Sequence, residues 1–340
     1  MQEAPKRHMS RLVAVFAVLA LIIAACGGGE GGDTTTADAG NGDGTTAPAG
    51  GDAEFDQYDL SGTTISVGSK DFDEQLVLGN MLKVAFEYVG ADVEDNINLG
   101  GTNLAREALV NGDIDTYVEY NGTGYAVHLA IEEEIPDDPE TLTSTVRERD
   151  LEENDIHWLS RAPFNNTYGF VSSPELTEEN GGPFDFQSMA DYLEANPDAT
   201  LCLESEFPNR DDGLILFEEA TGYTVPDNQI DILDTGLIYT ETNNNECDFG
   251  EVFTTDGRIQ ELDIELVEDP GAMILYNVSI NLRDDLYQEA PETFDAMAEA
   301  ILSGLSQERM TELNYQVSSL GESPEAVATE YLVSEGLISG

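Results

Sequence analysis

The order of apolar and polar positions in residues 63–120 predicts strands and helices in alternation. Strand-like runs lie at 63–67, in a segment that begins at Val93, and at 114–120. Between the first two runs, apolar residues recur at helical spacing, at Phe72, Leu76, Gly79, Leu82, Phe86 and Val89. A second helix is expected from Thr102 to 111–112, where an Asn-Gly pair ends it. This order predicts a parallel sheet with helices on its faces.

A second set of strands and helices follows along the chain. Strand-like runs lie at 168–171, 199–203, 230–233, 249–253 and 273–280, helical runs at 187–195 and 211–220, and a helical pattern continues from Leu282 to the end. We therefore expect two α/β lobes joined by short connections near 163–168 and 265–275. In such folds a ligand binds beyond the carboxyl ends of the strands, which here means the cleft between the lobes.

The N-terminal segment has the features of an export signal. Basic residues precede an apolar run at 12–25, which is too short for a comfortable membrane span. The run ends in Leu-Ile-Ile-Ala-Ala-Cys-Gly and resembles a lipoprotein signal, so we expect Cys26 to become the lipidated first residue of the mature chain. An ordinary signal peptide with a chance cysteine is the alternative. Residues 27–56 carry almost nothing large and apolar, and are expected to form a flexible tether.

Charge narrows the possible partners. The 340 residues include 69 Asp and Glu against 13 Lys and Arg, for a formal net charge of -56. Phosphate binding needs basic residues, so nucleic acid is excluded as a partner and anionic lipid headgroups are disfavoured. Cleavage before Cys26 would leave 10 basic and 68 acidic residues, with Lys70 and Lys83 as the only lysines.

Cysteine and histidine usage predicts neither a metal site nor a cofactor. Outside the cytoplasm, Cys202 and Cys247 are expected to form a disulfide, with two buried free thiols as the alternative. The three histidines, His8, His128 and His157, are scattered and lack metal-ligand spacing.

Enzyme signatures are absent from the sequence, and rare residue types carry more information. There is no Gly-x-Ser-x-Gly, Walker loop or His-Glu-x-x-His. Lys70 and Arg210 each lie at a predicted strand-to-helix turn, where they could bind an anion or merely pair with neighbouring acids.

Aromatic residues stand at strand ends and hinge positions. These are Tyr120, Tyr168, Phe253 and Tyr276. Together they could form a cage for a quaternary ammonium group, although each could equally be a core residue.

Six short segments occur in order within residues 63–335. They are 64–75 (TISVGSKDFDEQ), 99–103 (LGGTN), 106–115 (REALVNGDID), 119–124 (EYNGTG), 205–213 (SEF with RDDG) and 253–259 (FTTDGRI). Together they resemble one family, the substrate-binding subunits of glycine betaine/choline (quaternary amine) ABC importers.

The resemblance implies a type II two-lobe periplasmic-binding-protein fold, in which each lobe is a mainly parallel sheet flanked by helices. Together with the N-terminal pattern, it predicts a signal peptide at 1–25, the lipidated cysteine and tether at 26–60, lobe 1 at 61–164 plus 270–340, and lobe 2 at 165–269. The ligand lies in the cleft between the lobes.

The resemblance also implies roles for site residues. An aromatic box falls on Tyr120, Tyr168, Phe253 and Tyr276, and a carboxylate clamp on Lys70, Arg210 and Thr123. Phe253 stands where the family usually has a tyrosine. Asn165 and Asn166 are further candidates for polar contacts.

We therefore predict an extracytoplasmic receptor, lipid-anchored in the periplasm or on the outer face of the membrane. It would deliver glycine betaine or a related quaternary amine to membrane permease subunits as a monomer, without enzymatic activity. Choline, carnitine or a polar amino acid are alternative ligands; an exported carboxylate-dependent hydrolase and an adhesive surface protein are alternative classes.

Overall fold

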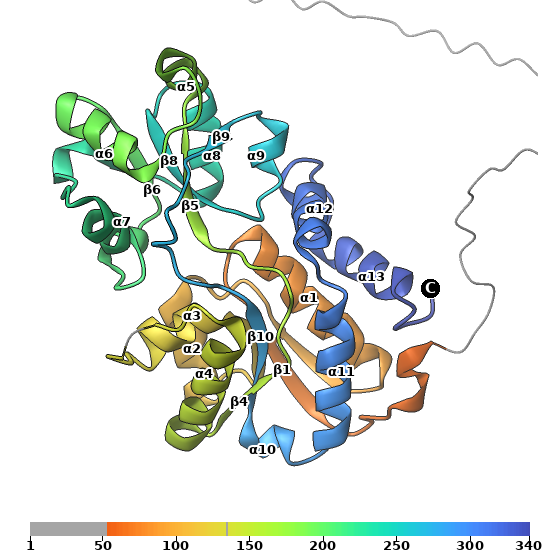
Figure 1. The fold of residues 1–340 in the computed structure, drawn as a ribbon. Coiled ribbons are helices and arrows are strands. Elements are labelled where there is room, and N and C mark those ends of the chain that lie inside the picture. Colours follow the sequence, from red (N-terminus) through yellow and green to blue (C-terminus); the bar gives the residue numbers. More distant parts are fainter. Residues whose placement is uncertain (1–52, 134) are drawn as a thin grey trace, which may run out of the picture. The chain divides into compact units, whose positions relative to one another are not determined.

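The computed structural model describes residues 53–133 and 135–340 (Figure 1). The predicted signal segment, Cys26 and most of the predicted tether lie outside these residues. Of the helices in the described part, none is both long enough and apolar enough to cross a membrane.

The first sheet, in lobe 1, has the strand order β2-β1-β3-β10-β4. Its strands are β1 (Thr64–Gly68), β2 (Asp92–Asn96), β3 (Thr116–Tyr120), β4 (Ile156–Leu159) and β10 (Val278–Arg283). β1 pairs in parallel with β2 and β3, whereas β10 lies antiparallel between β3 and β4. Four strands therefore run in one direction and β10 runs in the other.

The helices of lobe 1 come from both ends of the described chain. They are α1 (Asp73–Tyr88), α2 (Thr102–Asn111), α3 (Asn121–Thr123), α4 (Pro139–Asn154), α10 (Asp284–Tyr287), α11 (Pro291–Ser303), α12 (Gln307–Ser318) and α13 (Pro324–Ser334). The C-terminal helices α12 and α13 pack against α1 (Figure 1).

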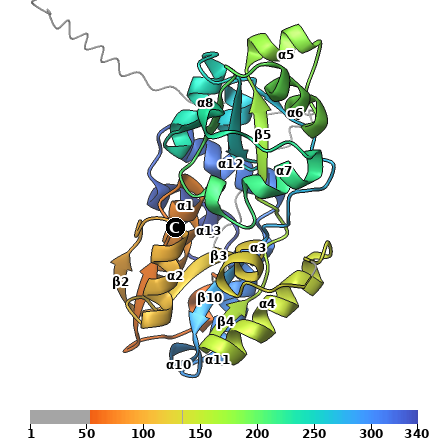
Figure 2. The ribbon, with the colours of Figure 1, turned by 90° about the vertical axis from the view of Figure 1, so that its left-hand side faces the viewer.

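The second sheet, in lobe 2, repeats this plan with the order β7-β6-β8-β5-β9. Its strands are β5 (Tyr168–Ser172), β6 (Leu201–Leu203), β7 (Ile230–Ile232), β8 (Phe249–Phe253) and β9 (Glu265–Leu266), and its helices are α5 (Pro174–Asn180), α6 (Phe186–Ala195), α7 (Leu214–Thr221), α8 (Thr235–Asn243) and α9 (Arg258–Glu261). Here β5 is the strand of opposite direction. Figure 2 shows the two sheets one above the other.

Two segments cross between the lobes, one from β4 to β5 and one from β9 to β10 (Figure 1). The parallel strands end at the cleft, so a strand that enters from the other lobe begins there and runs the opposite way. This explains why β5 and β10 are the two reversed strands. The mainly parallel α/β architecture predicted from the sequence is confirmed.

Three local predictions need correction. The strand expected at 273–280 begins only at Val278, because 274–276 instead bonds to the other crossing segment: Thr167 Oγ1 donates to Ile274 O, and Asn166 N–H to Tyr276 O. The strand then continues to Arg283, beyond the expected helix start at Leu282. The helix expected from Asp211 begins at Leu214, because an extended Arg210 and a turn precede it.

The segment just before β1 also packs on the body. Phe55 and Leu60, which fall in the predicted tether, are buried. Backbone N–H groups of Glu54 and Phe55 donate to carbonyls of Gly336 and Leu337. The two ends of the described chain thus meet on lobe 1.

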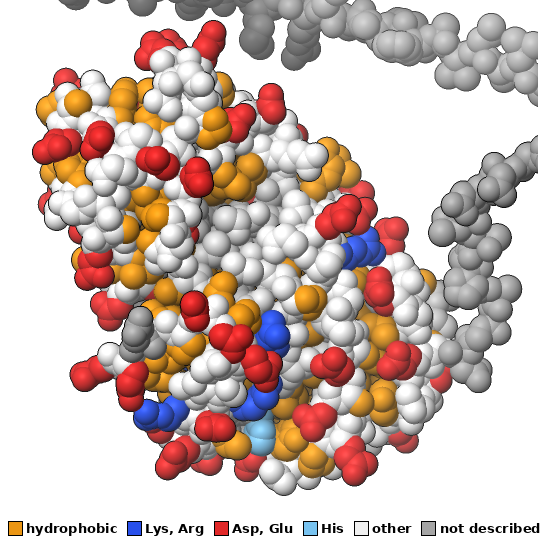
Figure 3. Space-filling model, in the orientation of Figure 1, with side chains coloured by type: hydrophobic (Ala, Val, Ile, Leu, Met, Phe, Trp, Pro, Cys, Tyr) orange, Lys and Arg blue, Asp and Glu red, His pale blue; other side chains and the backbone are white. Residues whose placement is uncertain are grey.

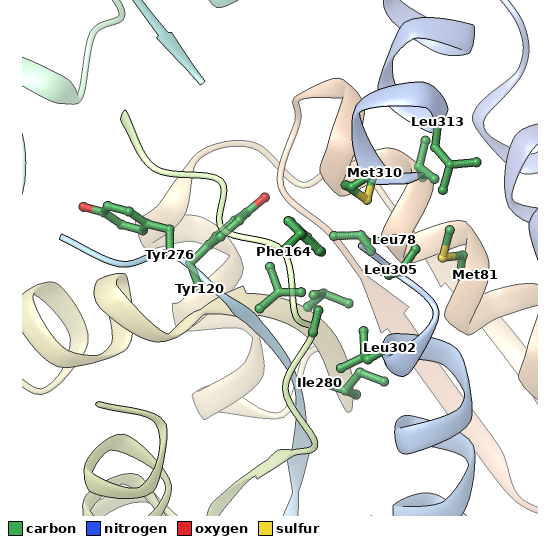
Figure 4. Packing of buried hydrophobic residues seen from close by; sticks show 14 of the residues in the cluster. Leu78, Met81, Tyr120, Phe164, Tyr276, Ile280, Leu302, Leu305, Met310 and Leu313 are labelled. Carbon is green, nitrogen blue, oxygen red and sulfur yellow. The ribbon is translucent and has the colours of Figure 1, made fainter. Parts of the chain in front are cut away.

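A large hydrophobic core runs through both lobes and past the cleft, and three smaller clusters of the described residues lie beside it. Figure 4 shows part of this core, from Tyr120 and Tyr276 on one side to Leu313 and Met81 on the other. The surface is acidic: on the face in Figure 3, red side chains are spread over both lobes and blue ones are few. Exposed carboxyl groups are thus common in this protein, and the buried carboxyl groups described below are the exception.

Candidate ligand-binding site

A cavity of about 220 Å³ lies between the lobes. Its lining residues come from both lobes and from both crossing segments: Lys70, Asp71, Phe72, Gly101, Thr102, Tyr120, Thr123, Asn166, Tyr168, Glu204, Ser205, Glu206, Leu233, Asp234, Thr235, Phe253 and Tyr276. A molecule held here would contact both lobes at once.

Five aromatic rings of this lining form a closed cycle of neighbours. The ring centroids are 6.1 Å apart for Phe72–Tyr120, 6.3 Å for Tyr120–Tyr276, 5.3 Å for Tyr276–Tyr168, 5.2 Å for Tyr168–Phe253 and 5.0 Å for Phe253–Phe72. The four aromatic residues expected in the box all belong to this cycle, and Phe72 is a fifth member.

Each ring lies at the cleft because its residue stands at a strand end, at the start of a helix or in a crossing segment. Tyr120 ends β3 and Phe72 precedes α1, so both come from lobe 1. Tyr168 begins β5 directly opposite Phe253 at the end of β8, and both come from lobe 2. Tyr276 lies in the crossing segment before β10.

Two hydroxyl groups fix rings in place. The Tyr120 hydroxyl donates to Glu74 Oε1 at 2.8 Å, and the Tyr276 hydroxyl donates to the Asp212 carbonyl at 3.2 Å. Figure 4 shows these hydroxyls pointing in opposite directions. The two rings therefore meet through their carbon edges and faces.

Lys70 lies in the lining but is paired with an acid of the protein. Its Nζ is 2.7 Å from Glu119 Oε1 and 5.1 Å from the centroid of the Tyr120 ring. Glu119 also accepts bonds from Tyr117, His128 and its neighbour's backbone N–H. Burial alone would raise the pKa of Glu119, but Lys70 and His128 together lower it. The positive charge of Lys70 is thus balanced inside the protein.

Arg210 lies beside the cavity, and every N–H of its guanidinium has a partner. Nε and Nη2 donate to the two carboxylate oxygens of Asp212, each at 2.7 Å. Nη1 contacts Thr102 Oγ1 at 3.1 Å and Glu206 Oε2 at 3.3 Å, and Nη2 contacts Thr123 Oγ1 at 3.2 Å. The guanidinium thus joins lobe 2 to two threonines of lobe 1, one of them the expected clamp residue Thr123.

Glu74, the second residue of α1, connects the two lobes. It is buried and accepts four hydrogen bonds, from Tyr120, Asn166, Thr255 and Asn314, at 2.6 to 2.8 Å. Burial raises the pKa of Glu74, although the four donors oppose this change. Because Thr255 follows β8 and Asn166 lies in a crossing segment, this carboxyl group ties lobe 1 to lobe 2 and the hinge.

Two carboxyl groups lie together at the cavity: Glu204 lines it, and Glu251 lies next to Glu204. Glu251 Oε2 accepts the backbone N–H of Glu204 at 2.9 Å, and Glu251 is 2% exposed. Burial raises the pKa of both groups, and their mutual repulsion raises that of Glu251 further.

The structure also joins Cys202 and Cys247 by a disulfide, with their Cα atoms 5.9 Å apart. The bond lies within lobe 2, and neither cysteine lines the cavity. Among residues 53–133 and 135–340, no cluster of three or more His, Cys, Asp or Glu has an arrangement that could hold a metal ion.

Sequence reasoning missed three residues of this region. Phe72 was assigned only to the apolar face of a helix, although its place two residues after Lys70 puts it at the same strand end. Glu206 and Glu74 lie within two of the segments that carry the family resemblance, but no role was predicted for either of them among 69 acids. Their roles depend on partners far away in the sequence.

Comparisons with known proteins identify the family of this chain. Residues 63–334 match the OpuAC family, described as the substrate binding domain of ABC-type glycine betaine transport systems. A glycine-betaine-binding protein of Pseudomonas aeruginosa is 31% identical over 286 residues, which cover 81% of this chain and 89% of that protein. The carnitine transport binding protein OpuCC of Listeria monocytogenes is 28% identical over 281 residues, covering 82% and 88%.

A solved structure shows the same fold. Apo YehZ from Escherichia coli superposes with a TM-score of 0.58 at 26% identity, over 81% of this chain and 99% of that chain. The family consists of extracytoplasmic substrate-binding proteins that work with permease subunits and are not enzymes, which removes the hydrolase and adhesive-protein alternatives. The predicted family and two-lobe fold are confirmed: this chain belongs to the substrate-binding proteins of ABC-type glycine betaine transport systems.

Proposed function

We propose that this protein captures a quaternary ammonium compound, glycine betaine or a related osmoprotectant, for import. The observation that carries the proposal is the closed cycle of five aromatic rings at the cavity. A trimethylammonium group cannot donate N–H bonds, so the electron-rich faces of aromatic rings are its natural partners.

The charge of the lining also favours a cation. Asp71, Glu204, Glu206 and Asp234 line the cavity, and the one lysine there is already paired with Glu119. An unpaired anion would meet mostly acidic side chains, whereas a cation would be attracted.

For a ligand that also carries a carboxylate, we propose Lys70, Arg210 and Thr123 as the groups that face it. All three lie at the cavity or directly beside it, and all three already have partners within the protein. Choline, without a carboxylate, and carnitine, with a longer chain, are the alternative ligands.

We further propose that the lobes close on the ligand by bending at the two crossing segments. Asn165 and Asn166 of one segment are bonded to Tyr276 of the other, which couples the two hinges. In the described structure the rings of the two lobes are already neighbours, so opening at these segments would admit the ligand, closure would return the rings to the ammonium group, and the closed form would dock on the permease.

Titration calorimetry tests the ligand class. Choline, glycine betaine, carnitine and proline betaine are each titrated into the purified body, beside the neutral isostere of choline in which a tert-butyl group replaces trimethylammonium. We expect binding of at least one quaternary amine and much weaker binding of the neutral isostere. Failure of all four amines to bind folded protein would contradict the proposal.

An amine with N–H groups is the second candidate, because four acidic residues line the cavity. Ethanolamine and choline differ only in N-methylation, so they separate the two candidates. Rings select choline, whereas carboxylates that accept N–H bonds select ethanolamine.

For localisation, we propose lipid anchoring through Cys26 and a monomeric body. Cys26→Ala should move the protein from the membrane fraction to the soluble fraction. Unchanged membrane association would contradict the anchor, and sedimentation at the mass of a dimer would contradict the monomer.

A further inference from the structure

Glu206 reaches across the cavity from lobe 2 to lobe 1. Its Oε1 accepts the backbone N–H of Thr102, the first residue of α2, at 3.1 Å. Its Oε2 lies 3.3 Å from Nη1 of Arg210. A carboxylate of the protein itself therefore sits on donors that belong to both lobes.

The backbone of lobe 1 leaves room for this carboxylate at Gly101. A Cβ atom at this position would lie 2.1 Å from Glu206 Oε1, well inside van der Waals contact. Any residue other than glycine would push the carboxylate away. The contact thus requires both Glu206 in lobe 2 and Gly101 in lobe 1.

Glu206 is also the more accessible of the two carboxylates that contact Arg210. The five guanidinium N–H groups are all engaged, so a ligand carboxylate can reach Arg210 only by displacing an existing partner. Asp212 is bidentate and its side chain is fully buried, whereas the Glu206 side chain is 33% exposed. Lys70 offers no free alternative, because it is paired with the buried Glu119.

We propose that Glu206 is a specificity-determining residue: it occupies the place of a ligand carboxylate on Arg210 and Thr102, and so favours quaternary cations without a carboxylate over zwitterions. The inference rests on the proposed function. A zwitterion must displace Glu206 and meets its negative charge, whereas a simple cation keeps Glu206 in place and is attracted by it.

The test compares choline with glycine betaine by calorimetry in wild type and four variants. Glu206→Ala removes the charge and vacates the place, and Glu206→Gln removes the charge alone. Gly101→Ala displaces the carboxylate without changing any charge. Asp211→Asn is the matched control, because it removes an exposed acid next to Arg210 that has no contact with the cavity. Thermal unfolding confirms that each variant is folded.

The measured quantity is the ratio of the glycine betaine Kd to the choline Kd. We expect wild type to prefer choline, and Glu206→Ala to lower the ratio by about tenfold or more, mainly through tighter betaine binding. Gly101→Ala and Glu206→Gln should lower it by about threefold or more, and Asp211→Asn should leave it within about twofold. If Glu206→Ala does not fold, the Gln and Gly101 variants decide.

The contradicting results are distinct. A ratio that stays within about twofold in every folded Glu206 and Gly101 variant, while wild type binds choline or betaine, overturns the role of Glu206 alone. An equal shift in Asp211→Asn also overturns it, since the effect would then be one of overall charge. If wild type binds no quaternary amine, the proposed function itself fails, and the inference with it.

Discussion

Nζ of Lys70 and Oε1 of Glu119 lie 2.7 Å apart in a site where the two side chains are 5% and 0% exposed. The lysine that sequence reasoning assigned to a ligand carboxylate thus has a full internal counter-charge. Two buried charges in contact are coupled strongly, and removal of one leaves the other unpaired.

Glu119→Gln should therefore destabilise the protein by about 3–5 kcal/mol at neutral pH. The pKa of Glu119 is lower in the folded state than in the unfolded chain, where it is 4.5. Its stabilising contribution is therefore complete above that unfolded value and is lost as the pH falls through the lower, folded one. The difference in free energy of unfolding between wild type and variant, measured with urea, should be constant near neutral pH and shrink in acid.

The double variant Lys70→Met with Glu119→Gln is the control for this pair. It should lose less stability than the two single variants lose together, because the double variant leaves no buried charge without its partner. Simple additivity would contradict the coupling.

The proposed role of Lys70 in ligand binding has its own test. Lys70→Ala should weaken the binding of glycine betaine more than the binding of choline, as measured by calorimetry. Equal losses of affinity would count against that role.

Glu251→Gln should have the opposite effect on stability. Burial and Glu204 raise the pKa of Glu251 in the folded state, so above the unfolded value of 4.5 its ionisation opposes folding. Removal of the charge should raise the free energy of unfolding at pH 8 by about 1 kcal/mol or more, and the gain should vanish as the pH falls below the unfolded pKa. Thermal unfolding at pH 8 and pH 4 measures this change in stability, with Glu178→Gln, a variant of an exposed acid, as control. A loss of stability at pH 8 would refute the claim that the charge of Glu251 opposes folding.

Glu74→Gln should weaken the junction between the lobes. One carboxylate oxygen serves Tyr120 and Asn166, and the other serves Thr255 and Asn314. The amide can accept from only one of these pairs, so two buried donors lose an acceptor, at about 1–3 kcal/mol each. Glu74→Asp keeps both oxygens and should recover part of the loss; a Gln variant as stable as wild type would rule out the four-donor arrangement.

Phe72→Ala should weaken the binding of a quaternary amine by about 5- to 30-fold, the range for one desolvated cation–π contact. Phe72 contacts Tyr120 on one side and Phe253 on the other, so its loss breaks the cycle of rings. Phe72→Tyr keeps the ring and should bind nearly as well. Calorimetry with choline measures both, and an unchanged affinity in the Ala variant would remove Phe72 from the site.

Cys202→Ser with Cys247→Ser should lower the free energy of unfolding by about 2–4 kcal/mol, because the bond closes a loop in the unfolded chain. The sequence separation of the pair is 45 residues. Urea unfolding of wild type and variant measures this loss. Alkylation of the unfolded wild type without reductant, followed by mass spectrometry, tests the bond itself, and labelling of both thiols would show that the bond is not formed.

The sequence by itself determined the order of strands and helices, the division into two lobes and the family. These follow from patterns among residues that are close along the chain, such as apolar spacing, Gly turns and ordered motifs. It also placed four aromatic residues at strand ends and hinge positions. Tyr120 and Phe253 reach the cleft because parallel strands end at one edge of a sheet. Tyr168 begins the reversed strand β5 and Tyr276 lies in the crossing segment before β10, so both reach it from the connections between the lobes.

Only the tertiary structure decided which charges meet. The partners of Glu74 are 46, 92, 181 and 240 positions away, and Glu206 meets a backbone N–H 104 positions away. Among so many acids, no local pattern distinguishes a buried carboxylate from a solvated one. The distinction arises because the segments before β5 and β10 cross between the lobes and bring distant parts of the chain together at the cleft, where each buried charge requires a partner.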